Sequence, residues 1–140
     1  MTLLTLHGTA IEIQGKAVLL TGKPGMGKSS LALQLIDRGA HLVADDQTYL
    51  TLEKKEVYVS CPNALKGLLK VRGVGIYPFP SQNKSPLNLV VEICELDEVL
   101  RLPDPTFAQY HNIPIPSLKL AKYDPLGALK VELKMGKKNA

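Results

Sequence analysis

Hydrophobic residues along the 140-residue chain fall into short runs and alternating stretches, which is the pattern of β-strands. Residues 9–13 alternate between apolar and polar positions, residues 17–21 form an apolar run, and Gly15 between them fits a tight turn. Residues 48–52 and 56–60 alternate as well, and the short connection between them has the length of a hairpin turn. The pattern predicts two strands joined by a turn, followed by a β-hairpin.

Further along the chain, two apolar segments predict strands, and two segments rich in glycine or proline predict less regular structure. Residues 41–44 form a short apolar strand, and residues 87–94 are almost continuously apolar, as is typical of a buried central strand. Residues 62–80 are rich in Gly and Pro and are expected to be irregular. Beyond Arg101, repeated prolines favour a meandering tail with short strands and no helix.

One segment carries the spacing of an amphipathic helix. In residues 28–38, Leu31 and Leu35 fall on one side within a wide apolar face, and Gly39 follows as a C-terminal stop. The expected fold class is therefore α/β, with a strand-rich mixed sheet and one main helix. The length fits a single domain over residues 1–140.

Charge and composition narrow the classes of partner. The chain carries 17 Lys and Arg against 13 Asp and Glu, a formal net charge of +4. Such a mildly basic surface suits an acidic protein or a phosphorylated ligand. Aromatic residues make up only 5% of the chain and Trp is absent, which leaves little for base stacking, so we expect no nucleic-acid partner.

The sequence also lacks the signals of a membrane segment and of a disulfide framework. No apolar run approaches the roughly 18 residues that span a membrane, and the N-terminus lacks the basic and apolar regions of a secretory signal. We therefore expect a cytoplasmic protein with no membrane partner. Cys61 and Cys94 match neither a zinc-ligand spacing nor a CxxC pair, so both are expected to be reduced, packed thiols.

Residues 22–29 match the phosphate-binding motif GxxxxGK[ST] in full, between a predicted strand and the predicted helix. Glycines let such a loop curl so that backbone N–H groups point at a phosphate, and the helix N-terminus adds positive charge. Lys28 can reach the outer phosphates, and the Ser29 hydroxyl can bind Mg²⁺. A glycine-rich turn capped by Ser29 is the alternative, which the full motif in this context disfavours.

The expected ligands of this motif are therefore ATP and Mg²⁺. Its expected binding residues are Gly22, Lys23, Pro24, Gly25, Met26, Gly27, Lys28 and Ser29.

Two adjacent carboxylates, Asp45 and Asp46, follow the predicted strand 41–44. Strand ends of this kind lie beside the phosphate loop in α/β sheets. Neighbouring strand residues point to opposite sides, so the two acids are expected to do different work. One can hold Mg²⁺ or its water, and the other can accept a hydroxyl proton during phosphoryl transfer. A solvated turn before the hairpin is the alternative, which the neighbouring phosphate motif disfavours.

Four blocks in this order resemble the C-terminal catalytic domain of HPr kinase/phosphorylase. They are Leu6-His7-Gly8-Thr9, the phosphate motif, residues 38–46 and residues 71–76. The resemblance implies a fold similar to the nucleotide-binding core of phosphoenolpyruvate carboxykinase. With no further domain in the sequence, the chain looks like the short single-domain form of the family.

The resemblance also implies an activity and a partner. It implies a Mg²⁺-dependent kinase that phosphorylates a serine of HPr, the phosphocarrier of the sugar phosphotransferase system that regulates carbohydrate metabolism. The donor is ATP or pyrophosphate. In the reverse reaction, inorganic phosphate attacks the phosphoserine and releases pyrophosphate. A homo-oligomer, a hexamer by resemblance, is expected.

Residue roles follow from the same resemblance. Asp46 matches the general base on the substrate serine, and the general acid in the reverse direction. Lys28 matches the lysine of the phosphate loop, and Ser29 matches a Mg²⁺ ligand. His7 matches a histidine of the site, and Arg72 matches the arginine of the RGxGI segment, which suits a phosphate or a carboxylate.

The chain departs from the family pattern at three places. Lys70 stands where the family has a metal-binding Glu, so Asp45 and waters would have to complete the Mg²⁺ coordination. Ser30 replaces the acidic residue that usually follows the motif. The C-terminal block tied to dephosphorylation is missing, with residues 114–119 in its region, so the phosphorylase direction is less expected than the kinase. Arg101 is a candidate replacement for another catalytic arginine.

Two other functions stay open at this point. The first is a nucleotide-binding regulatory module in which Lys70 has disabled the metal chemistry. The second is a small-molecule kinase, which is disfavoured because no separate substrate pocket is legible in the sequence. A protein substrate could instead dock on the Gly- and Pro-rich surface of residues 72–86.

Overall fold

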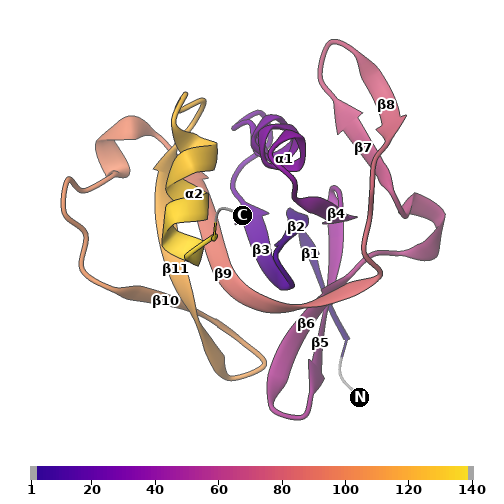
Figure 1. Cartoon of the computed structure of the whole chain (residues 1–140). Coiled ribbons are helices and arrows are strands. Elements are labelled where there is room, and N and C mark those ends of the chain that lie inside the picture. Colours follow the sequence, from indigo (N-terminus) through magenta and orange to yellow (C-terminus); the bar gives the residue numbers. More distant parts are fainter. Residues whose placement is uncertain (1–2, 139–140) are drawn as a thin grey trace.

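The computed structural model describes residues 3–138 and shows a strand-rich, curled sheet with two helices (Figure 1). The helices are α1 (Lys28–Asp37) and α2 (Gly127–Met135), and the single-turn 3₁₀ helices are η1 (Asn63–Leu65) and η2 (Leu96–Glu98). The strands, in chain order, are β1 (Leu3–His7), β2 (Thr9–Ile13), β3 (Lys16–Thr21), β4 (His41–Ala44), β5 (Gln47–Glu53), β6 (Glu56–Ser60), β7 (Leu68–Val71), β8 (Gly75–Pro78), β9 (Lys84–Cys94), β10 (Thr106–Tyr110) and β11 (Ile113–Ala121).

The long strand β9 organises the main sheet. Its first residues pair antiparallel with β6, and its later residues lie between β3 and β11, parallel to both. The path of the nine-stranded sheet runs β1-β5-β6-β9-β3-β2-β4, and β10 pairs with β11. Because β3, β9 and β11 are parallel, their carboxyl ends meet at one edge of the sheet.

Both faces of the central strands are buried, which explains their almost continuous apolar sequence. On β3, Val18 and Leu20 pack in one core cluster with α1 and α2, whereas Leu19 packs in a second cluster with β5 and β6. On β9, Val91 belongs to the helix-side cluster and Val90 to the other. The strands predicted from residues 9–21, 41–44, 48–60 and 87–94 are all confirmed, as is the first helix.

The prediction that residues 62–80 are irregular was wrong in part, because they contain the hairpin β7–β8. Leu69 is fully buried against the helix-side core, whereas the four residues of β8 are exposed. The hairpin therefore buries only Leu69 and leaves β8 in solvent, apart from the main sheet (Figure 1). A segment with so few buried positions has no clear strand periodicity.

The expectation of no helix beyond Arg101 was also wrong, because α2 covers the sheet next to α1 (Figure 1). The last proline of the chain, Pro125, precedes the helix, and no proline lies within it. Ala128 and Val131 are buried in the helix-side core, and Gly136 ends the helix with a left-handed conformation (φ 69°). The helix was not predicted because the prolines before it favoured irregular structure for the whole segment.

A buried carboxylate fastens α2 to the end of α1. The Arg38 guanidinium donates from Nε to Glu132 Oε1 at 2.9 Å, and the Lys137 ammonium donates to Glu132 Oε2 at 3.0 Å. Lys137 also donates to the Arg38 carbonyl oxygen at 2.8 Å. Burial alone would raise the pKa of Glu132, but the hydrogen bonds from Lys137 and Arg38 outweigh it and leave this pKa below its ordinary value.

Replacing Glu132 with Gln is expected to lower the free energy of unfolding at neutral pH by about 2–3 kcal/mol, because it leaves two cations without their counter-ion. Because the pKa of Glu132 is lower in the folded chain than in the unfolded chain, its carboxylate stabilises the fold at pH values above the unfolded-state pKa. This stabilisation is lost as the pH falls through the folded-state pKa. The difference in free energy of unfolding between the natural chain and Glu132→Gln should therefore shrink in acid. Urea denaturation of both chains at several pH values measures this difference. Glu53→Gln, at the exposed ion pair with Lys84, is the control and should cost under about 1 kcal/mol; an equal loss for both variants contradicts the prediction.

The two cysteines are free, as predicted. Cys94 is buried and Cys61 is half-buried, and desolvation raises the pKa of both thiols, which disfavours the reactive thiolate. In the part of the chain that the structure describes, no helix is long and apolar enough to cross a membrane.

Candidate functional site

The loop between β3 and α1, residues 22–27 and here called the glycine loop, has a backbone that only glycine adopts readily. Gly22, Gly25 and Gly27 have φ values of 146°, 83° and 91°. A Cβ on Gly22 would lie 2.7 Å from the carbonyl oxygen of Ile93, so a side chain there would push β9 away. The glycines thus let the loop curl tightly against the carboxyl edge of the sheet.

The N-terminus of α1 is open to an anion. Gly27 is its N-cap residue, no side chain among the described residues caps it, and its first turn carries no acidic residue. The backbone N–H groups of a first helical turn have no partner within the helix, so they are available to a phosphate. The Lys28 ammonium lies against the loop, donating to the carbonyl oxygens of Gly22 at 2.7 Å and Lys23 at 3.2 Å. The loop therefore presents both backbone donors and a positive charge.

Asp45, at the end of β4, is buried and connects three parts of the fold. Its Oδ1 accepts from the hydroxyls of Thr9 at 3.0 Å and Ser29 at 3.3 Å, and its Oδ2 accepts from the backbone N–H of Lys70 at 3.0 Å. All three donors are uncharged, and no described residue forms an ion pair with Asp45. The result is a buried carboxylate, 8% exposed, next to the helix that follows the glycine loop.

The Ser29 hydroxyl and the Asp45 carboxylate could together bind a cation whose remaining ligands come from phosphate and water. The described residues contain no cluster of three His, Cys, Asp or Glu side chains that could hold a metal ion by themselves. Mg²⁺ in phosphoryl-transfer sites, however, is commonly held by one or two protein groups together with phosphate oxygens and water. The Ser29 hydroxyl and the Asp45 carboxylate, already in contact, are suited to that arrangement.

Asp46 differs from Asp45 in every respect that matters for chemistry. It is exposed, its φ is 70°, and the N–H of Gln47 donates to the Asp45 carbonyl oxygen at 2.7 Å across it. These features define a γ-turn with positive φ, a rare and strained conformation. Such strain is typical of functional sites. The two acids therefore have different surroundings, one buried and one exposed, and a turn rather than strand alternation separates them; their different roles stay a prediction.

His7 and Asp46 are brought together by backbone pairing. His7 ends β1 opposite Gln47 of β5, and the N–H of Gly8 donates to the Asp46 carbonyl oxygen at 3.1 Å. His7 is exposed, like Asp46. His7 and Asp46 are thus exposed residues on paired segments, whereas the adjacent Asp45 is buried.

The arginines predicted for the site lie in two different places. Arg72 follows β7 in the turn of the hairpin and is exposed, two residues beyond Lys70, whose backbone holds Asp45. Arg101 instead lines a groove beside α2 and β11, with Leu118, Leu133 and Lys134 among its neighbours. That groove shares no residue with the glycine loop or with the two aspartates.

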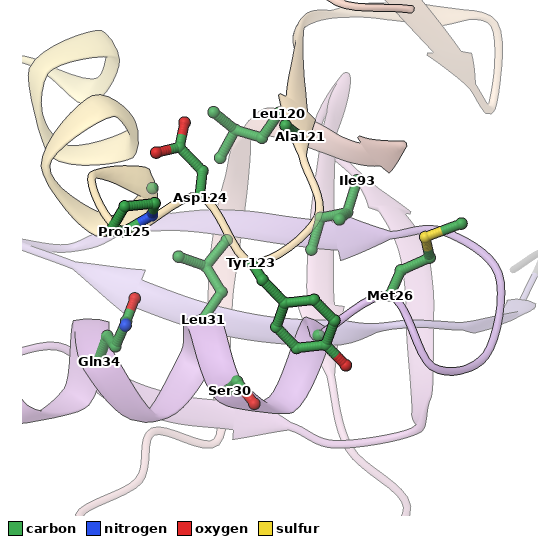
Figure 2. A pocket seen from close by; sticks show the side chains of 12 residues that line it. Met26, Ser30, Leu31, Gln34, Ile93, Leu120, Ala121, Tyr123, Asp124 and Pro125 are labelled. Carbon is green, nitrogen blue, oxygen red and sulfur yellow. The ribbon is translucent and has the colours of Figure 1, made fainter. Parts of the chain in front are cut away.

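Two residues at the site were not recognised from the sequence. The Thr9 hydroxyl donates to Asp45. Thr9 belongs to the block Leu6-His7-Gly8-Thr9 that carries the resemblance, but no role was predicted for it from the sequence. The Tyr123 hydroxyl donates to the Gly25 carbonyl oxygen at 2.9 Å, and a Cβ on Gly27 would lie 3.0 Å from the Tyr123 ring (Figure 2). Tyr123 comes from a turn 98 residues beyond Gly25, so no local pattern could reveal it.

Comparison with known proteins places these features in a family. The family model of the HPr serine kinase C-terminal domain matches residues 2–120. Among curated proteins, the HPr kinase/phosphorylase of Burkholderia lata is 39% identical over 121 residues, covering 81% of this chain and 35% of the relative. The HPr kinase/phosphorylase of Burkholderia cenocepacia is 38% identical over the same length. The chain thus spans about a third of the length of these curated relatives.

Solved structures agree with the sequence relatives. The Hpr(Ser) kinase/phosphatase of Coxiella burnetii superimposes with a TM-score of 0.83 at 28% identity, covering 95% of this chain and 99% of that one. The resemblance drawn from residues 6–76 is thereby confirmed. Because the family model matches most of its residues, the chain belongs to the family of HPr serine kinase C-terminal domains.

Proposed function

We propose that this chain is a single catalytic domain that phosphorylates a serine of an HPr-type phosphocarrier with Mg²⁺ and ATP, and that pyrophosphate can replace ATP as donor. The observation that carries the proposal is the contact between Ser29 and the buried Asp45, which the exposed and strained Asp46 follows in the chain. In this proposal Ser29 and Asp45 would hold a cation, and Asp46 would accept a proton. The names of the relatives support the same activity.

The glycine loop would bind the phosphates of the donor. Backbone N–H groups of the first turn of α1 and the Lys28 ammonium would neutralise the charge on the outer phosphates. We propose that the chain is in this respect a P-loop domain of the HPr kinase and phosphoenolpyruvate carboxykinase type. Binding through phosphates alone is compatible with either ATP or pyrophosphate.

Ser29 and Asp45 would hold Mg²⁺, which supplies positive charge to the phosphate oxygens when bound. Thr9 and the backbone N–H of Lys70 keep the Asp45 carboxylate oriented toward Ser29. Lys70 lies on β7, donates to Asp45 through its backbone N–H alone, and has an exposed side chain.

Asp46 would act as general base on the acceptor. As the serine oxygen attacks the γ-phosphorus, the bond from that phosphorus to the bridging oxygen breaks, ADP leaves, and the serine proton passes to the Asp46 carboxylate. In the reverse direction inorganic phosphate attacks the phosphoserine, pyrophosphate forms, and Asp46 returns the proton to the serine oxygen. His7 and Arg72 would contact the phosphate or the carrier at the same surface. A catalytic role for Arg101 stays a prediction, and no step here uses it.

The carrier would dock on the exposed surface around the hairpin β7–β8. All four residues of β8 are exposed, and Ile76 and Tyr77 present apolar surface of the kind that a protein partner covers. Arg72 lies in the turn of this hairpin and would contact the docked carrier. Assembly into a homo-oligomer, by family a hexamer, and action in the cytoplasm on the phosphotransferase system are part of this proposal.

A nucleotide-binding regulatory module is the second candidate, and one observation favours it. Lys70 carries a cation on the strand whose backbone contacts Asp45, where it would oppose a metal ion. Incubating the chain with Mg-ATP and an HPr-type carrier, followed by mass spectrometry, tests the two functions. The kinase predicts phosphoserine on the carrier that EDTA prevents and that a carrier without the acceptor serine lacks. Nucleotide binding without phosphoserine contradicts it.

Replacing Thr9 with Val is expected to lower the free energy of unfolding by about 1.5–3 kcal/mol, because a buried donor to a charged acceptor is lost. It should also raise the Mg²⁺ concentration needed for nucleotide binding, since Asp45 loses one of the groups that orient it. Thr48→Val is the matched control, because Thr48 is equally buried but donates to the Gly8 carbonyl oxygen. An unchanged Mg²⁺ titration for Thr9→Val, or an equal rise in both variants, contradicts the role given to Thr9.

A further inference from the structure

A small cavity lies directly beside the glycine loop, between α1 and the turn that follows β11 (Figure 2). It encloses about 120 Å³. Met26 and Gly27 of the loop form part of its wall, as do Ser30 and Gln34 of α1 and Tyr123 of the turn. Its base is the carboxyl edge of the parallel strands β9 and β11, where ligands bind in open α/β sheets.

The cavity and Asp45 lie on different sides of α1. Ser29 faces Asp45, to which its hydroxyl donates. Ser30 is one residue further along the helix, turned by about 100°, and lines the cavity instead. Gln34 follows Ser30 by one helical turn on the same side. A donor whose outer phosphate lies toward Asp45 therefore has its other end free to enter the cavity.

The chemistry of the walls suits a flat, partly polar ring. Leu31, Ile93 and Leu120 supply apolar surface, and Tyr123 supplies an aromatic ring. The Gln34 amide offers both a donor and an acceptor. Pockets that enclose a whole drug-sized ligand measure about 300–1,000 Å³, so a cavity of about 120 Å³ holds one ring system and not a complete nucleotide.

Tyr123 is held in place before any ligand arrives. Its hydroxyl donates to the Gly25 carbonyl oxygen at 2.9 Å, and its ring lies against Gly27, where a Cβ would be only 3.0 Å from the ring. A ring fixed in this way gives up little conformational freedom when another ring stacks on it.

We infer that this cavity is the subsite for the base of a nucleoside triphosphate donor, with Tyr123 as its stacking residue. The inference rests on the proposed function and deepens it: a base subsite makes the nucleotide a better ligand than its phosphates alone. ATP should therefore bind more tightly than a donor without a nucleoside, and pyrophosphate would be the weaker of the two donors that the glycine loop admits.

The test compares two ligands with Mg²⁺ by titration calorimetry: ATP, and inorganic tripolyphosphate, which has the same phosphates and no nucleoside. The wild-type chain should bind ATP about tenfold more tightly or better, as one stacked base allows. Tyr123→Phe keeps the ring and should keep most of this preference. Tyr123→Ala should lose it, with a smaller change for tripolyphosphate.

A second pair of variants tests the cavity without touching the loop. Gln34→Trp should fill the cavity and reduce ATP binding to the level of tripolyphosphate. Asp37→Trp, an exposed position on α1 outside the cavity wall, should leave both affinities unchanged.

Each outcome has one meaning. Equal affinity of the wild-type chain for both ligands overturns the base subsite and leaves the proposed phosphate site standing. Equal losses for both ligands in Tyr123→Ala, with the preference intact in Gln34→Trp, also overturn it, because Tyr123 would then act on the loop alone. A wild-type chain that binds neither ligand contradicts the proposed function itself.

Discussion

Replacing Asp46 with Asn is expected to slow phosphate transfer to the carrier serine by about 10²–10⁴-fold, the usual contribution of a general base. The amide cannot accept the serine proton, but it is almost the same size as the carboxylate. Asn also tolerates the positive φ of 70° that this position requires, so the turn should keep its shape. Initial rates of transfer at saturating Mg-ATP measure the effect.

The binding of the nucleotide separates this role from a structural one. Asp46→Asn should leave the affinity for Mg-ATP unchanged, because among the described residues no hydrogen bond joins the exposed Asp46 to the glycine loop or to Ser29. Asp45→Asn should instead raise the Mg²⁺ concentration needed for nucleotide binding, since Asp45 contacts Ser29 directly. Unchanged turnover in Asp46→Asn would show that another group accepts the proton, and the assignment of Asp46 would be wrong.

Replacing Lys28 with Met is the second large effect that we expect. A charge-assisted contact to phosphate is worth about 1.5–3 kcal/mol, so the affinity for Mg-ATP should fall by about 10–100-fold. The transfer rate should fall further, because the ammonium also stabilises the charge that develops on the phosphates. Calorimetric titration and initial rates measure these two quantities.

Lys23→Met is the matched control, because Lys23 lies in the same loop with an exposed side chain. Only its backbone carbonyl contacts the Lys28 ammonium, and the substitution keeps that carbonyl. Nearly wild-type binding is expected for Lys23→Met. If both substitutions weaken binding equally, the loop attracts phosphate by its general charge, and Lys28 has no special place in it.

Most of the sheet could be predicted because its strands are buried on at least one face. The alternation in residues 48–60 and the continuous apolar run 87–94 both follow from which faces the core covers. The hairpin β7–β8 left no such trace, since β8 is fully exposed and only Leu69 of β7 is fully buried. Helix α2 was missed because its short buried stripe follows a proline-rich segment.

The phosphate motif and the paired aspartates were legible because their chemistry depends on residues close together in the chain. The role of Thr9 depends on a hydrogen bond to Asp45 across two strands, and the role of Tyr123 on a turn brought back from the far end of the chain. Neither contact has a spacing that a sequence displays. Only the folded arrangement shows that Asp45 contacts Ser29 and that Tyr123 contacts Gly25.

The most direct test of the kinase assignment is the transfer of radiolabelled γ-phosphate from Mg-ATP to the serine of an HPr-type carrier, measured for the natural chain beside Lys70→Glu. The Lys70 side chain is exposed, and only its backbone N–H is hydrogen-bonded to Asp45, so the contact between Ser29 and Asp45 does not depend on the Lys70 side chain. We expect the natural chain to label the serine, and Lys70→Glu to label it faster. Labelling by Lys70→Glu alone would contradict the kinase and show a nucleotide-binding module instead.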